Sequence, residues 1–97
     1  APPHRAGRRE FVRWGESHFG LADRSRRECD KLPAEQQCGC LQRADASYRQ
    51  SVSWFERVTS DADASRSLVR AHDRQLAAAS RIYELGCTAD LPGTDAP

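Results

Sequence analysis

Residues 29–40, CDKLPAEQQCGC, decide the fold of this chain. Pro33 disfavours a helical conformation at the residue before it, and it suits the first turn of a new helix. Glu35 follows in that first turn, where an acidic side chain favours the helix dipole. Three of the chain's four cysteines also fall in this stretch. The stretch therefore predicts a short connection between two helices, with three sulfur atoms gathered at that end.

Apolar residues recur at helical spacing on both sides of this connection, and no stretch alternates long enough to be a strand. The pattern predicts helices over about 8–31, 34–59 and 64–85, with Gly86 ending the third. Gly15 and Gly20 weaken the first helix by roughly 1 kcal/mol each relative to Ala. They predict a kink near Gly20 or a close helix contact at Gly15.

The apolar stripes of the three helices define the expected core. On the third helix, seven residues are expected to point inward: Leu68, Val69, His72, Leu76, Ala79, Ile82 and Tyr83. The core shared by all three helices is expected to contain Phe11, Trp14, Leu41, Tyr48, Val52, Phe55, Leu68, Leu76 and Ile82. His18 and His72 both lie on apolar stripes without an acidic neighbour at helical spacing, so we expect hydrogen-bonded core histidines rather than ligands.

Three helices of similar length joined by short connections predict one all-α domain over residues 1–97, an up-down-up three-helix bundle. Residues 88–97 contain two Pro and a Gly, and they are expected to form a flexible tail. In this topology Cys29, Cys38, Cys40 and Cys87 all lie at one end of the bundle. Leu, Ile, Val and Phe number only 15 of the 97 residues, so disulfides are the expected supplement to a thin core.

Cys38 and Cys40 diverge by about 200° around their helix, so a bond between them is not expected. One should reach the first helix and the other the third. Two pairings remain: Cys29–Cys38 with Cys40–Cys87, which we favour, or Cys29–Cys40 with Cys38–Cys87. Other uses of the same residues are a redox pair at Cys38 and Cys40, Cu(I) held by these two thiols, or zinc held by all four.

Charge and motifs exclude several classes of function. The chain has 14 Arg, one Lys and a net charge of +1, and its basic residues are interleaved with acidic ones rather than with aromatic ones. This pattern is not that of a nucleic-acid-binding protein. No catalytic motif or nucleotide-binding glycine loop occurs, so we expect no enzyme and no cofactor. No apolar stretch predicts membrane insertion.

Trp54 and Val58 lie beside the stripe of the second helix rather than on it. They are expected either to cover a neighbouring helix or to contact a partner protein, with Arg57 and Arg43 at the rim. The opening Ala1-Pro2-Pro3 resembles a chain whose signal peptide has been removed, which predicts a periplasmic or extracellular location. The expected function is non-catalytic protein binding, as in inhibitors, toxin-immunity proteins and secretion accessories. The alternative is a thiol-redox or metal-binding protein that uses the Cys-Gly-Cys motif.

Overall fold

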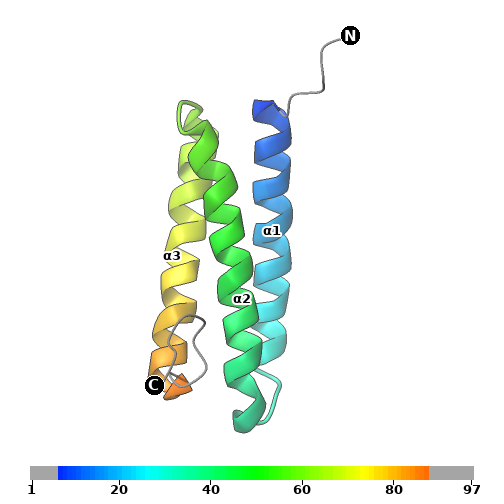
Figure 1. Ribbon diagram of the computed structural model, residues 1–97, viewed down its shortest axis with the longest axis vertical. Helices are drawn as coiled ribbons and strands as arrows, with labels where there is room; N and C mark the ends of the chain where they lie inside the picture. Colours follow the sequence, from blue (N-terminus) through cyan, green and yellow to red (C-terminus); the bar gives the residue numbers. More distant parts are fainter. Residues whose placement is uncertain (1–6, 88–97) are drawn as a thin grey trace, which may run out of the picture.

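The computed structural model describes residues 7–87 and consists of helices. Helix α1 spans Arg8–Cys29, α2 spans Ala34–Phe55, a short 3-10 helix η1 spans Glu56–Val58, and α3 spans Ala62–Glu84. Each of the three long helices runs antiparallel to the one before it, down, up and down in the view of Figure 1, with α2 between the other two. The expected three-helix, disulfide-linked all-α fold is thereby confirmed. The expected tail, residues 88–97, lies outside the described residues.

The helix ends follow from local sequence. Pro33 is the N-cap of α2, and its extended backbone separates α2 from α1. Asp61 is the N-cap of α3, and its Oδ1 accepts hydrogen bonds from the backbone N–H groups of Asp63 and Ala64 at 2.9 and 3.0 Å. Gly86 has a φ of +74°, a left-handed conformation that glycine adopts without strain, and it ends α3 as expected.

Helix α2 forms the centre of the molecule, because α1 and α3 both pack on it and touch each other at few points. Tyr48, Phe55 and Leu41 of α2 are fully buried, and Ile82 of α3 is buried with them, as expected. Four other residues expected in the core are only half-buried: Phe11, Trp14, Val52 and Leu68.

The expected close contact at Gly15 is confirmed. A Cβ atom at this position would lie 2.7 Å from the ring of Phe55, so only glycine lets that ring pack against α1. The hydroxyl of Ser51 donates a 2.7 Å hydrogen bond to the Gly15 carbonyl beside it. At Gly20, by contrast, nothing lies within 4 Å of a built Cβ atom, and α1 continues through this residue as helix.

The prediction of which α3 residues point inward is wrong in part. Val69, Leu76 and Tyr83 are 61, 48 and 77 % exposed, and His72 is exposed as well. The residues that α3 buries are Ala64, Ala71, Gln75, Ala78 and Ile82. Three of these are alanines at seven-residue spacing, and small side chains allow α3 to approach α2 closely. Close approach selects this face, although the neighbouring face carries larger apolar side chains.

Two disulfides join the helices at one end, Cys29–Cys40 and Cys38–Cys87, each with a Cα–Cα distance of 5.5 Å. The favoured pairing was therefore wrong, and the second pairing is present. The reason is the helical phase of α2. Cys38 lies seven residues, about two helical turns, before Asp45, so the two share one side of α2. This side faces α3, because the carboxylate of Asp45 accepts a hydrogen bond from Gln75. Cys40 lies eleven residues, about three turns, before Ser51, and this side faces α1, because Ser51 bonds to the Gly15 carbonyl.

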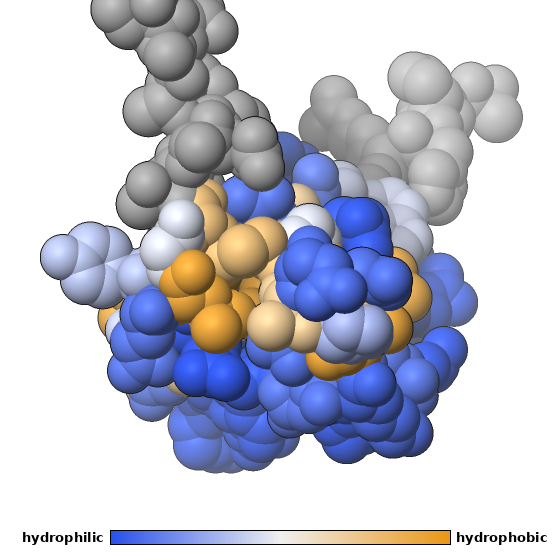
Figure 2. All heavy atoms as spheres, turned by 90° about the horizontal axis from the view of Figure 1, so that it is seen from below, coloured by the Kyte–Doolittle hydropathy of each residue, from blue (hydrophilic) through white to orange (hydrophobic). Residues whose placement is uncertain are grey.

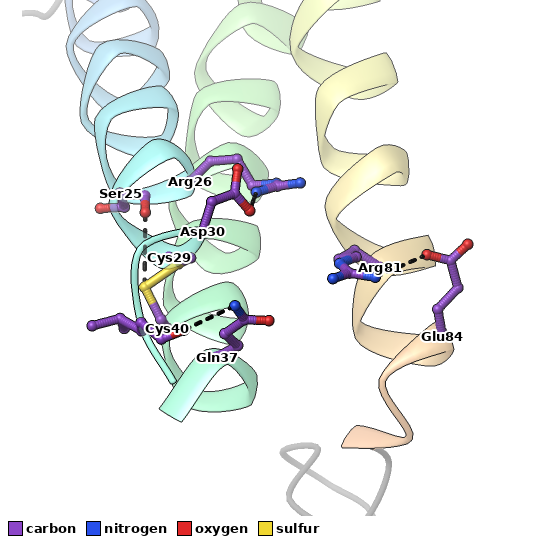
Figure 3. Close-up of polar contacts among 9 residues, drawn as sticks. Ser25, Arg26, Cys29, Asp30, Gln37, Cys40, Arg81 and Glu84 are labelled. Atoms are coloured by element: carbon purple, nitrogen blue, oxygen red, sulfur yellow. Dashed lines mark hydrogen bonds and ion pairs between the residues drawn. A yellow bond between two sulfur atoms is a disulfide. The ribbon is translucent and has the colours of Figure 1, made fainter. Parts of the chain in front are cut away.

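The disulfides belong to an apolar cluster that closes this end of the bundle. Its buried members are the sulfurs of Cys29, Cys40 and Cys87 with Leu41 and Ile82. Figure 2 shows this end from below, with hydrophobic residues gathered among hydrophilic ones. Figure 3 shows the Cys29–Cys40 bond between the end of α1 and the start of α2. A cluster of this kind shields both disulfides and fixes the three helix ends relative to one another.

Candidate partner-binding surface

The indole of Trp54 packs against α1. Its ring centroid lies 4.8 Å from that of Trp14 and 5.7 Å from that of Phe11, which it stacks against. The indole Nε1 is buried without a hydrogen-bond partner. Of the two arrangements expected for Trp54, the structure therefore shows the one in which it covers a neighbouring helix.

The remaining residues expected at the partner surface are not brought together. Arg57 lies over the rings of Trp54 and Phe11, with its guanidinium carbon 4.6 and 5.6 Å from the ring centroids. Val58 is buried, and Arg43 is exposed nearer the other end of α2, about 16 Å along the helix from Trp54. A partner role for these four residues stays a prediction, whereas Trp54 and Arg57 contact Phe11 and so join the end of α2 and η1 to α1.

The Cys-Gly-Cys motif is divided between two bonds. Cys38 is bonded to Cys87 beyond α3, and Cys40 to Cys29 of α1. Within residues 7–87, no three His, Cys, Asp or Glu side chains are grouped as metal ligands. In this oxidised form the motif therefore connects helices, and it presents neither a closed dithiol pair nor a set of free thiolates.

A partly buried polar network ties the middle of the three helices together. The carboxylate of Asp23 on α1 accepts hydrogen bonds from the phenol of Tyr48 on α2 and the guanidinium of Arg74 on α3. Burial alone would raise the pKa of Asp23, but these two bonds outweigh it and lower the pKa below its ordinary value. Burial and the adjacent carboxylate raise the pKa of Tyr48. Such a network connects the three helices and stabilises the bundle.

A small cavity of about 180 Å³ is lined by residues of α1 and α3 and by Phe55 of α2. Phe19 and Phe55 supply apolar walls, and Gly20 leaves its α1 wall open. Glu16 and Arg70, both exposed, stand at its edge. The cavity holds no grouping of nucleophile, base and oxyanion donor, so its residues do not indicate catalysis.

Among residues 7–87, most of the exposed large apolar side chains lie on one face of α3, which the sequence pattern placed in the core. We call it the outer stripe, and it consists of Ser65, Val69, His72, Leu76, Ala79 and Tyr83. These residues follow one another at intervals of four, three, four, three and four, the spacing of a helix face that packs on another helix. Each of these residues directly follows a residue of the face that packs on α2. The two faces therefore have the same spacing, and the sequence pattern alone did not separate them.

The outer stripe faces away from α1. Arg74, which reaches Asp23 of α1, lies roughly 160° around α3 from Leu76, the central residue of the stripe. Shallow depressions run along the outer side of α3, one beside Val69 and the other between Leu76 and Tyr83. Among residues 7–87, no other helix covers this side of α3 (Figure 1).

The edge of the outer stripe carries charges of both signs. Arg66 and Glu84 stand near opposite ends of α3, and Asp73 lies between them. Arg66 forms an exposed ion pair with Asp63, and Glu84 forms one with Arg81 at 3.8 Å (Figure 3). Exposed pairs of this kind contribute little free energy and exchange readily. The stripe itself carries no carboxylate, Lys or Arg.

Comparison with family models, with curated proteins and with solved structures found no match to this chain. The surface therefore has to be interpreted from its own chemistry. Within residues 7–87, no helix has both the length and the apolar composition needed to span a membrane.

Proposed function

We propose that this chain is a non-catalytic protein-binding module of the inhibitor, toxin-immunity or secretion-accessory type, and that it binds through the outer stripe of α3. The observation that carries the proposal is the exposure of Val69, Leu76 and Tyr83 on one helix face at seven-residue intervals. Large apolar side chains aligned in this way are the usual anchors when a helix packs into a partner's groove. Tyr is also among the residues enriched at binding hot spots.

The energetics of the fold support this assignment. The inner face of α3 is largely alanine, so burying the neighbouring face against the chain's own core would have offered more apolar area. The disulfides and the cluster around them stabilise the bundle without that area. A stable fold can therefore leave three large apolar residues in solvent, where they are available to a partner.

The two disulfides support the proposed periplasmic or extracellular location, because such bonds persist mainly in oxidising compartments. They also support the structural use of the cysteines over the thiol-redox or metal-binding alternative, since all four sulfurs are bonded.

The test is site-specific photo-crosslinking of the full chain in its native host. A photoreactive amino acid at position 76 should form an adduct with one discrete protein, and the same group at position 17 should not. Ser17 is the control because it is exposed but lies on α1, and the outer stripe faces away from α1. Excess wild-type chain should suppress the adduct, and excess Leu76→Asp chain should not. Equal labelling at both positions would contradict the proposal.

A further inference from the structure

We infer that the partner of the outer stripe is a second copy of this chain, with the two α3 helices packed antiparallel. This inference rests on the proposed function, because it names the occupant of the same surface. Two features of the described residues carry it: the order of large and small side chains along the stripe, and the charges at its edge.

The first feature is size complementarity. The stripe's spacing of four, three, four, three and four reads the same in both directions, so an antiparallel copy places every stripe residue opposite another. In the register that aligns all six, Tyr83 faces Ser65 of the second copy and Val69 faces its Ala79. Leu76 faces His72. The outer layers then combine a larger with a smaller side chain, and the central layers combine two of similar size, which allows the two helices to pack evenly along their length.

A parallel pairing lacks this complementarity. It would place Tyr83 opposite Tyr83 and Ser65 opposite Ser65, so that the helices would be forced apart at one layer and underpacked at another. The antiparallel register is therefore the one that the stripe favours.

The second feature is charge. Arg66 and Glu84 lie on the same edge of α3, eighteen residues apart, which is five helical turns. In the antiparallel register, Arg66 of each copy lies beside Glu84 of the other, so the dimer gains two opposite-charge pairs at its ends. Both side chains are exposed, and their present ion pairs, with the exposed Asp63 and the half-exposed Arg81, are weak enough to exchange for pairs between the two copies.

One like-charged contact opposes the pairing. Asp73 of each copy lies on this same edge near the two-fold axis, so the two carboxylates approach each other. Because Asp73 is exposed, solvent screens this repulsion. The stripe is about 27 Å long from Ser65 to Tyr83, which gives a contact near the small end of specific interfaces. We therefore expect a reversible dimer whose population rises with protein concentration.

The experiment is sedimentation equilibrium of the full, oxidised chain over a wide concentration range. The wild-type chain should change from monomer to dimer mass. Leu76→Asp should weaken dimerisation at least tenfold, and the control Ser17→Asp, at an exposed position of α1, should not. Asp73→Asn should strengthen it, because the like-charged contact is removed. Circular dichroism should show the same helix content for every variant, since all these positions are exposed.

Charge reversal tests the orientation. Arg66→Glu and Glu84→Arg should each dimerise several-fold more weakly than wild type, because each creates two like-charged pairs. An equimolar mixture of the two variants should form a heterodimer more tightly than either self-associates, since both cross-pairs are again opposite in sign. A mixture no tighter than the separate variants would overturn the antiparallel register.

The outcomes separate this inference from the proposed function. A wild-type chain that stays monomeric while position 76 crosslinks to a different protein overturns self-pairing and leaves the binding surface in place. A dimer unaffected by Leu76→Asp overturns self-pairing through the stripe. If position 76 also forms no adduct in the native host, the proposed function fails as well.

Discussion

The ring of Phe55 occupies the space that a side chain at Gly15 would need, with 2.7 Å between the nearest ring carbon and a built Cβ atom. Phe55 is fully buried, so moving its ring away from a new side chain would disturb the packing around it. This contact sets the distance between α1 and α2 in the half of the bundle far from the disulfides. Because of this contact, substitution of Gly15 and substitution of Gly20, the two glycines of α1, should change the stability of the fold in opposite directions.

Gly15→Ala should therefore destabilise the fold by roughly 1–3 kcal/mol, because overpacking against Phe55 exceeds the gain in helix propensity. Gly20→Ala is the matched control in the same helix. It should stabilise the fold by up to about 1 kcal/mol, because the new methyl group meets no atom within 4 Å. Urea denaturation followed by circular dichroism measures both changes. Equal effects of the two substitutions would contradict the contact.

The Asp23–Tyr48 hydrogen bond predicts a dependence of stability on pH. The pKa of Asp23 is lower in the folded than in the unfolded chain, so ionised Asp23 stabilises the fold, and this stabilisation is fully present above about pH 4. The contribution is lost as pH falls through the folded pKa. Tyr48→Phe removes one of the two bonds that lower this pKa, and it should cost roughly 1–2 kcal/mol at neutral pH.

Acid titration of the wild-type chain, Tyr48→Phe and Asp23→Asn measures this dependence. The stability of Asp23→Asn should vary less with pH below about pH 4 than that of the wild type. If both chains lost stability in parallel over this range, the carboxylate would not be the responsible group.

The two disulfides should contribute unequally to stability. Cys38–Cys87 closes a separation of 49 residues and Cys29–Cys40 one of 11. On the chain-entropy model these loops correspond to about 4 and about 3 kcal/mol. The double substitution Cys38→Ser with Cys87→Ser should therefore lower the unfolding free energy more than Cys29→Ser with Cys40→Ser.

Two measurements on the unmodified chain accompany that comparison. Peptide mapping without reduction should recover Cys29 with Cys40 and Cys38 with Cys87. Thiol titration should find no free thiol in either the native or the unfolded protein. Two reactive thiols would instead indicate a redox or copper site, and four thiols with bound zinc would indicate a metal site.

Trp54→Ala should lower stability by roughly 2–4 kcal/mol, because the indole packs on Trp14 and Phe11. Trp54→Phe should cost less, since it keeps an aromatic ring there and removes a buried N–H group that lacks a partner. Thermal unfolding of the two variants measures the difference. An unchanged melting temperature for Trp54→Ala would restore Trp54 as an exposed anchor rather than a packing residue.

The sequence alone determined the number, order and approximate bounds of the helices, and it placed the four cysteines at one end. These features depend on local chemistry: Pro33 separates two helices, Asp61 caps the third, and Gly86 ends it. Gly15 was also recognisable, because a glycine within a helical apolar stripe needs a packing reason. Each inference used only residues within a few turns of one another.

Tertiary structure alone decided which face of α3 turns inward and how the cysteines pair. On α3, two faces one residue apart have the same spacing, and only the close approach to α2 selects the alanine face over Val69, Leu76 and Tyr83. On α2, Cys38 and Cys40 lie on opposite flanks, and which flank meets α3 depends on the rotation of α2 within the bundle. Both choices depend on how whole helices pack together, which spacing along one helix does not encode.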